Sequence, residues 1–310
     1  MNPSTRVSSV LAIAAFAVTM TACGTTAGTT TGTTTGASAV QGPAAPSKSP
    51  VPSVGAAQPI SGADMAGHIH NLAYDGRQLL IGTHEGLWGQ APGARPAQVS
   101  DDAFDVMGLT IAGDRWLASG HPGEGMDAPA DLGLLQSTDR GRTWAEVSLG
   151  GEVDFHRLAA SGAIVVGVNA HDGRLLRSRD GGSAWTDLGA PGLYDLAVSP
   201  ADPAVIVGTS ESGPVRSIDS GASFNAVGGA PLLALLAWAG GTLYGADVDG
   251  RIHESMDDGI TWKPLGSLPS QPSAFAATGT TVAALVGDTV LESVDGGASF
   301  TPRITGLGGH

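Results

Sequence analysis

The sequence predicts an all-β protein: a six-bladed β-propeller with four-stranded blades, preceded by a signal peptide and a disordered linker. A short motif recurs five times, and its copies start 41, 39, 38 and 38 residues apart. A fixed period near 40 residues is typical of repeat folds, and four short apolar runs per period match the four strands of a propeller blade. Gly (47) and Pro (19) are abundant among the 310 residues and provide turns, which excludes a helical bundle.

The charge of the chain argues against nucleic acid as a partner. Asp and Glu number 29 against 15 Lys and Arg, and the only lysines are Lys48 and Lys263. Binding to a phosphate backbone needs a basic patch, and the sequence has no basic run. Hydrophobic residues make up 42% of the chain, so a large core is available. We therefore expect a folded protein that binds no nucleic acid.

Residues 1–22 have the features of a bacterial lipoprotein signal peptide. An apolar run over residues 7–20, too short to span a bilayer, ends just before the only cysteine, Cys23. The segment Met-Thr-Ala-Cys-Gly at 20–24 resembles the lipobox of bacterial lipoproteins, which implies cleavage before Cys23 and lipidation of its thiol. The alternative is an ordinary secretory signal with an unrelated cysteine. The expected location is the extracytoplasmic face of the bacterial cell membrane, with the membrane as a partner through Cys23.

Residues 23–62 form a Thr/Gly/Pro/Ala-rich segment. Such a composition buries too little apolar surface to fold, so we interpret this segment as a flexible tether. The propeller domain is then expected over residues 63–310. Its approximate blades are 66–103, 104–151, 152–190, 191–229, 230–269 and 270–304, with pairing of the terminal segments to avoid a free sheet edge.

The repeated motif reads Ser-x-Asp-x-Gly-x-(Ser/Thr/Ala)-(Trp/Phe). Ser and Asp side chains fix a tight turn through hydrogen bonds to nearby backbone, Gly allows a positive φ, and the aromatic ring packs between neighbouring sheets. The motif residues are Ser137, Asp139, Gly141, Trp144, Ser178, Asp180, Gly182, Trp185, Ser217, Asp219, Gly221, Phe224, Ser255, Asp257, Gly259, Trp262, Ser293, Asp295, Gly297 and Phe300.

This motif resembles the Asp-box, or BNR, repeat of sialidases, sortilin-type receptors and photosystem II assembly factors. The resemblance implies that each motif forms the turn between the third and fourth strands of a blade. A Ca²⁺ or sugar site at these turns is the alternative, and a purely structural role is the favoured interpretation. The first blade, which begins near His68, lacks the motif.

Six of the eight histidines fall on loops expected at one rim of the propeller. In such a fold, the loops that enter the first strand and those that join the second and third strands lie on one face, opposite the Asp-box turns. The six residues belong to three adjacent blades and are His68, His70, His84, His121, His156 and His171. The other two, His253 and His310, are expected in an outer strand and at the C-terminus.

These histidines suggest a transition-metal site at the mouth of the central channel. Imidazole binds copper or zinc, and the thioethers of Met65 and Met107, at two strand entrances, favour Cu(I). Neighbouring carboxylates would orient the rings, and the candidates are Glu85, Glu124, Asp154 and Asp172. The alternatives are a small polar or glycan ligand, and loop histidines that bind no ligand.

The segments HIHNLAYDG (68–76), GTHEGLW (82–88), MGLTIAGD (107–114) and ASGHPGEG (118–125) resemble bacterial exported propellers labelled glycosyl hydrolases. A glycoside hydrolase or sialidase-like enzyme is therefore one alternative function, and a protein-docking scaffold similar to the photosystem II assembly factors is another. A sialidase needs an arginine cluster for the substrate carboxylate, and Arg157, Arg174 and Arg251 form no recognisable pattern. An enzyme is thus less expected than a binding protein, and the protein partner of a scaffold is unknown.

Overall fold

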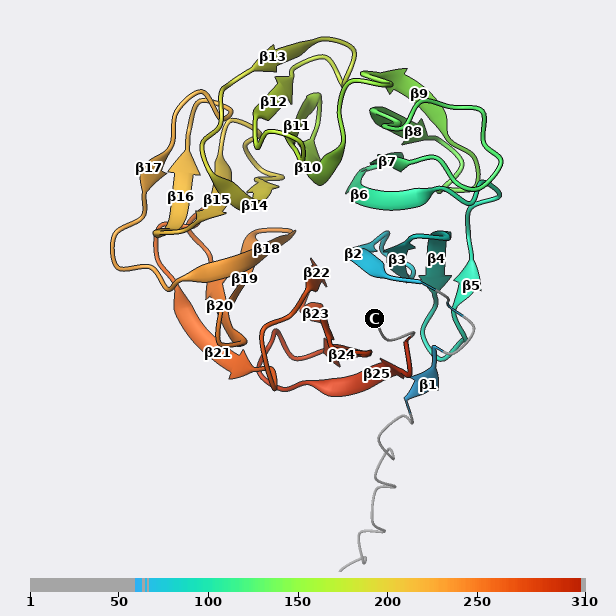
Figure 1. Ribbon diagram of the computed structural model, residues 1–310. Helices are drawn as coiled ribbons and strands as arrows, with labels where there is room; N and C mark the ends of the chain where they lie inside the picture. The colour runs from blue at the N-terminus through green and yellow to red at the C-terminus, as the bar shows by residue number, and fades with distance from the viewer. Residues whose placement is uncertain (1–58, 63–64, 66, 308–310) are drawn as a thin grey trace, which may run out of the picture. The chain divides into compact units, whose positions relative to one another are not determined.

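In the computed structural model, which describes residues 59–62, 65 and 67–307, six β-sheets stand around a ring (Figure 1). Five sheets have four strands and one has five. Consecutive strands of a blade are antiparallel neighbours, and the first strand of each blade faces the centre of the ring. The predicted six-bladed β-propeller is confirmed. The predicted signal peptide, Cys23, most of the tether and His310 lie outside the described residues.

The observed strands follow the six predicted repeats. Blade 1 contains β2 (Ile69–Tyr74), β3 (Leu79–Thr83), β4 (Gly86–Gln90) and β5 (Ala97–Gln98). Blade 2 contains β6 (Asp105–Ala112), β7 (Arg115–His121), β8 (Leu134–Ser137) and β9 (Ala145–Ser148). Blade 3 contains β10 (Phe155–Ser161), β11 (Ile164–Asn169), β12 (Leu175–Ser178) and β13 (Trp185–Asp187).

The second half of the ring repeats this arrangement. Blade 4 contains β14 (Leu193–Val198), β15 (Ile206–Ser210), β16 (Gly213–Ser217) and β17 (Asn225–Ala226). Blade 5 contains β18 (Leu233–Ala239), β19 (Thr242–Asp247), β20 (Arg251–Ser255) and β21 (Lys263–Ser267). Blade 6 contains β22 (Ala274–Thr278), β23 (Thr281–Val286), β24 (Thr289–Ser293), β25 (Thr301–Thr305) and the added strand β1 (Ile60–Ser61).

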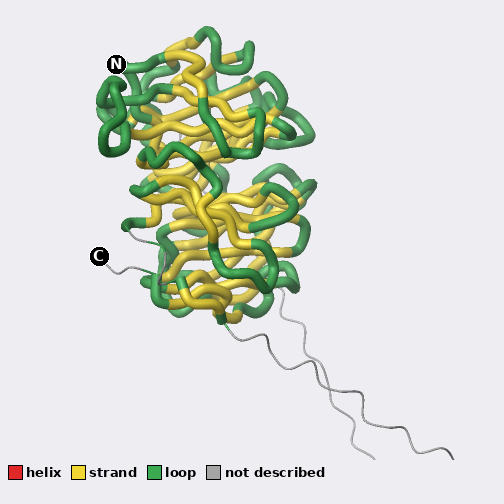
Figure 2. The backbone as a smooth tube through the Cα atoms, turned by 90° about the vertical axis from the view of Figure 1, so that its right-hand side faces the viewer, coloured by secondary structure: helices red, strands yellow, loops and turns green. Residues whose placement is uncertain are grey.

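The hydrophobic core is divided among the contacts between neighbouring blades. One cluster, for example, joins Leu72 and Ile81 of blade 1 to Ala283 and Ile304 of blade 6. Because both faces of a blade are covered by its neighbours, strand β3 is buried at every position. Figure 2 shows only strands and loops in the described part of the chain, so no described helix is available to span a membrane.

The ring is closed by the N-terminal segment. Strand β1 runs parallel to β25, with Ile60 opposite Ile304, so the predicted pairing of the terminal segments is confirmed. The propeller sheet thus begins at Ile60, inside the segment expected to be tether. Ile60 is an isolated apolar residue in a low-complexity stretch, and the partner that gives it a strand lies more than 200 residues away.

All five Ser-x-Asp-x-Gly motifs join the third strand of a blade to its fourth. In blade 4, Ser217 Oγ donates to Asp219 Oδ1 at 2.7 Å and accepts from the Gly221 amide at 2.8 Å. Asp219 Oδ2 accepts from Ser223 Oγ at 2.6 Å, and Gly221 has a φ of +86°. Phe224 is half-buried and packs against the core cluster shared by blades 3 and 4, as expected for the aromatic position. Hydrogen bonding within the turn occupies the Asp carboxylate, which supports a structural role.

Candidate metal centre

The first strands of blades 1 to 5 share a register shift near their beginning. A residue at such a β-bulge is left out of the regular ladder, and its side chain is turned away from the sheet pattern. The shifts occur at Ile69/Asn71, Val106/Gly108, Phe155/Arg157, Leu193/Asp195 and Leu233/Leu235. The residues at the bulges are therefore His70, Met107, His156, Tyr194 and Ala234. The repeat thus brings two imidazoles and one thioether to equivalent positions in three adjacent blades.

Four of these bulge residues line one hollow at the end of the ring. His70, Met107, His156 and Tyr194 all contribute to the wall of a cavity of about 600 Å³. His70 and His156 also border a second cavity, of about 300 Å³, which is lined by the first strands of all six blades. Both imidazoles therefore lie where the central channel opens.

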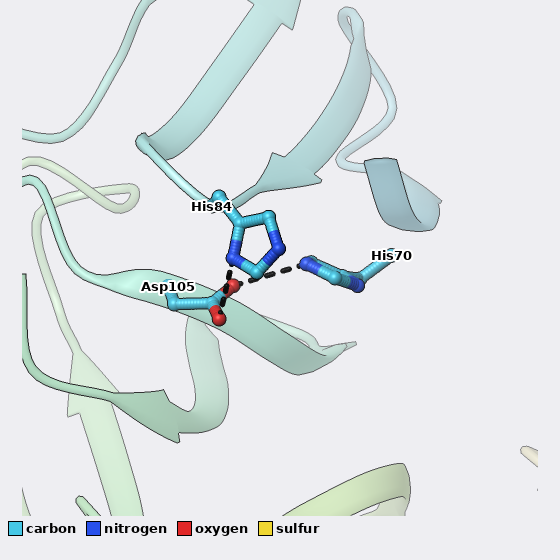
Figure 3. Close-up of side chains that lie close together, drawn as sticks. All are labelled: His70, His84 and Asp105. Atoms are coloured by element: carbon cyan, nitrogen blue, oxygen red, sulfur yellow. Dashed lines mark hydrogen bonds and ion pairs between the residues drawn. The ribbon is translucent and has the colours of Figure 1, made fainter. Parts of the chain in front are cut away.

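His70, His84 and Asp105 form the first of two groups at this rim (Figure 3). His84 follows β3, and Asp105 begins β6 in the next blade. The carboxylate of Asp105 lies between the two rings: Oδ2 is 2.8 Å from His84 Nδ1, and Oδ1 is 3.1 Å from His70 Nε2. One ring nitrogen of each histidine and one carboxylate oxygen lie within 4.8 Å of one another. We call these three residues the first cluster.

Because two polar atoms of the first cluster are buried, they destabilise the fold if they have no hydrogen-bond partner. His70 Nε2 and Asp105 Oδ1 are inaccessible to solvent, and neither makes a hydrogen bond of good geometry within the described part of the chain. Burial raises the pKa of Asp105, but the neighbouring imidazoles of His70 and His84 outweigh it and lower the pKa. Asp105 is therefore a carboxylate held ionised between two rings.

His68 adds a third imidazole beside the first cluster. Its ring centroid is 5.4 Å from that of His84 and 6.4 Å from that of His70, whose ring it parallels. The backbone carbonyl of His68 accepts from the His84 amide at 3.2 Å, so the two residues are fixed next to each other. The side chain of His68 is exposed. It borders the cluster from the solvent side.

A side chain of blade 1 fixes the position of Asp105 relative to His70. Asn71 Nδ2 donates to the carbonyl of Val106 at 2.9 Å and to that of Met107 at 3.1 Å. These carbonyls belong to the bulge that directly follows Asp105. Asn71 follows the bulge of β2, and its side chain is bonded to the backbone at the bulge of β6. It therefore links the entrances of these two strands.

His121, Asp154 and His156 form a second cluster one blade further along the ring. His121 ends β7, and the other two residues stand at the entrance to β10. Asp154 Oδ2 lies 2.6 Å from His156 Nε2 and 3.5 Å from His121 Nε2. The Asp154 side chain is 3% exposed, and its Oδ1 atom has no hydrogen-bond partner among the residues described.

Asp131 and His171 extend the second cluster outward. Asp131 Oδ2 accepts from His171 Nε2 at 2.9 Å, and Asp131 Oδ1 is 3.6 Å from His121 Nδ1. The hydrogen bond to Asp131 is the main reason that the pKa of the exposed His171 is raised, with a further contribution from the charge of the same carboxylate. His171 is therefore linked to the cluster through a carboxylate.

The six predicted histidines fall into two groups of three. His70 and His84 contact Asp105 of the next blade, with His68 beside them. His121 and His156 contact Asp154, and His171 contacts Asp131.

Of the four carboxylates predicted to orient the rings, only Asp154 belongs to one of the two clusters. Asp154 contacts two of the rings, whereas Glu85 and Glu124 are exposed and belong to neither cluster. Asp172 is also exposed, and its Oδ1 accepts from the Arg174 amide within a turn.

Met65, which we expected near the site, is 3% exposed and packs in the core between blades 6 and 1. An apolar side chain at the start of a blade is drawn into the nearest blade contact, so its thioether does not face the rim. Met107 does line the hollow beside His70 and His156.

The sequence analysis missed Asp105 and Asp131. A signal for Asp105 was present: it stands two residues before the bulge residue Met107, as Asp154 stands two before His156 and His68 two before His70. Alignment of the strand entrances would have identified it. Asp131 lies in a long loop of blade 2, and the repeat provides no equivalent position for it.

No family model matches the sequence, and no curated protein matches it significantly. Solved structures match in fold. A GH74 xyloglucanase from Xanthomonas campestris aligns at a TM-score of 0.53 and 18% identity, over 78% of this chain and 46% of that one. A GH74 enzyme from Niastella koreensis aligns at 0.52 and 20%, over 77% and 37%. A chain of a nidogen/laminin complex aligns at 0.57 and 12%, over 73% and 93%.

This chain therefore spans less than half the length of the two GH74 enzymes that it resembles. At such low identity the likeness extends to the fold alone, because propellers with unrelated functions share it. The class of protein that fold and comparisons define is a six-bladed β-propeller.

Proposed function

We propose that this protein is a lipid-anchored β-propeller of the extracytoplasmic bacterial surface that binds a transition metal, copper or zinc, at the channel mouth. The observation that carries the proposal is the first cluster, in which a buried carboxylate lies between two imidazoles. Imidazole nitrogen with one carboxylate oxygen is a donor set suited to zinc and copper. Cys23 would hold the protein at the membrane, and the turns resembling Asp-boxes would act only as structural parts of the blades.

The geometry of the first cluster requires little adjustment to hold an ion. Donor atoms bound to one tetrahedral zinc at roughly 2.0–2.1 Å lie about 3.4 Å apart. The three donor atoms here are within 4.8 Å of one another, and the half-exposed His84 side chain is the least confined of the three residues. His68 is the nearest additional imidazole for a fourth position. A bound cation would also give a common partner to buried His70 Nε2 and Asp105 Oδ1, which face each other at 3.1 Å without a well-formed hydrogen bond.

The test is the metal content of the full-length chain. Purified protein is loaded separately with Zn²⁺ and Cu²⁺, freed of excess ion and analysed for bound metal. We expect wild type to retain metal and the doubly changed His70→Ala/His84→Ala protein to lose an ion. Glu85→Gln is the matched control, since Glu85 adjoins His84 in sequence, is exposed and lies outside the cluster. Equal retention by all three proteins would refute the proposal.

Two other functions have weaker support. A glycoside hydrolase would use two carboxyl groups on either side of the scissile bond, and the rim offers Asp105 and Asp154. Each of these carboxylates is already engaged by two imidazoles, which favours metal binding. Turnover of a glycoside by metal-free protein would favour the enzyme instead. A docking scaffold would be indicated by a protein partner whose binding survives loss of the histidines.

A further inference from the structure

The second cluster offers its own complete set of metal donors. His121 Nε2, His156 Nε2 and an oxygen of Asp154 come from blades 2 and 3, and none of the three residues belongs to the first cluster. One donor atom of each residue lies within 4.8 Å of the other two, a limit that the donors of the first cluster also meet. An ion bound here would not compete with the first cluster for a ligand.

The tautomer of His121 leaves its ring nitrogen Nε2 available as a donor. His121 Nδ1 lies 2.9 Å from the carbonyl oxygen of Ala130. A carbonyl can only accept, so Nδ1 carries the proton, and in the neutral ring Nε2 keeps its lone pair. That lone pair lies 3.5 Å from the carboxylate of Asp154. An ion bound at Nε2 would therefore lie beside that carboxylate.

Asp154 provides a separate indication of a missing partner. Its side chain is 3% exposed, and a buried carboxylate is strongly destabilised unless its charge is compensated. One oxygen, Oδ2, contacts both rings, whereas Oδ1 has no hydrogen-bond partner in the described structure. A divalent cation between Asp154 and the two imidazoles would compensate the charge and give Oδ1 a partner.

The outer pair of Asp131 and His171 fits the surroundings of a metal ligand. Histidines that bind metals usually donate their second ring nitrogen to a carbonyl or carboxylate, which fixes the ring and raises its basicity. His121 does so toward the carbonyl of Ala130, with Asp131 Oδ1 at 3.6 Å. His171 holds Asp131 in place from the solvent side at 2.9 Å.

From these contacts we propose that the chain binds a second transition-metal ion at His121, Asp154 and His156. This proposal rests on the proposed function for the kind of ion, and it adds a site that the first cluster does not supply. His70 of the first cluster and His156 of the second line the same hollow of about 600 Å³, so both ions would border one solvent-filled space.

The test is a calorimetric titration of the full-length, metal-stripped chain with Zn²⁺. We expect two ions per wild-type chain, one per chain for His121→Ala/His156→Ala, and one per chain for His70→Ala/His84→Ala. His156 is 42% exposed and His121 is 37% exposed, and circular dichroism would verify that the chain still folds without them. Glu124→Gln, an exposed change outside both clusters, should keep both ions.

The outcomes separate the two proposals. One ion in wild type, unchanged in the His121→Ala/His156→Ala protein and lost in the His70→Ala/His84→Ala protein, would overturn the second site and leave the proposed function standing. The converse pattern would support the second site and remove the first. Failure of wild type to bind either Zn²⁺ or, in a parallel titration, Cu²⁺ would overturn both. Asp154→Asn gives an independent check, since loss of this charge should also remove one ion.

Discussion

The Nε2 atom of His70 in blade 1 lies 3.1 Å from Oδ1 of Asp105 in blade 2. Both atoms are buried, and neither makes a well-formed hydrogen bond in the described part of the chain. The contact joins two consecutive repeats, so it exists because blade 1 packs against blade 2. In our interpretation, the energetic cost of such unpaired atoms is offset when a cation binds between them.

The position of this contact should depend on Asn71. Replacement Asn71→Ala removes both hydrogen bonds to the backbone that follows Asp105, while every metal donor remains. We expect the affinity for Zn²⁺ at the first cluster to fall about 10- to 100-fold, as for other residues that orient ligands. Titration measures the affinity, and Asn225→Ala, an exposed change in β17, serves as the control. Unchanged affinity would show that Asn71 does not position the site.

Ring closure should depend on Arg303. Its guanidinium, only 10% exposed, donates to the Gln90 carbonyl at 2.9 Å and to Glu292, and so links blade 6 to blade 1. Removal of one partner of a buried ion pair typically costs about 3–5 kcal/mol. We expect Arg303→Ala to lower the free energy of unfolding by about that amount, measured by urea denaturation. Lys263→Ala, which breaks an exposed pair with Glu254, should cost less than about 1 kcal/mol.

The Ser-x-Asp-x-Gly turns should lose their stabilising effect in acid. Hydrogen bonds from Ser223 and Ser217 lower the pKa of Asp219 from 3.8 to about 2. A carboxyl group whose pKa is lowered by folding stabilises the folded state above its unfolded pKa, and this effect is lost as the pH falls through the folded pKa. The difference in melting temperature between wild type and Asp219→Asn should therefore be full at pH 7 and vanish near pH 2. A difference that does not change with pH would contradict this role for the charge.

The proposed lipid anchor predicts where the protein is found in the cell. In a bacterial host that processes lipoproteins, wild type should appear in the membrane fraction and incorporate labelled fatty acid. Cys23→Ser should remove the label and release the folded protein into the soluble extracytoplasmic fraction. Membrane association that survives Cys23→Ser would indicate another means of attachment.

The fold could be predicted from the sequence because each repeat carries local signals. The motif from Ser217 to Phe224 indicates one turn of a blade. Its five copies and the strand pattern that precedes the first of them together give six blades. Pairing of the terminal segments could be predicted, but its start at Ile60 could not, because Ile60 becomes a strand only by pairing with Ile304. The motif also gives no measure of how far each aromatic ring is buried.

The candidate site was only partly predictable for a similar reason. The histidines could be assigned to one rim from their places at strand ends. Their division into two clusters depends on Asp105 and Asp154, which reach across blade contacts. Bulges such as that at His70 also leave no recognisable sequence pattern, although they decide where the rings point.

The most direct test of the metal site is anomalous diffraction from crystals of the protein loaded with Zn²⁺, recorded at the zinc absorption edge. We predict a peak about 2.0–2.2 Å from His70 Nε2, from an oxygen of Asp105 and from a ring nitrogen of His84. Zinc-loaded crystals in which these three side chains keep their present contacts and no peak lies among them would contradict the account.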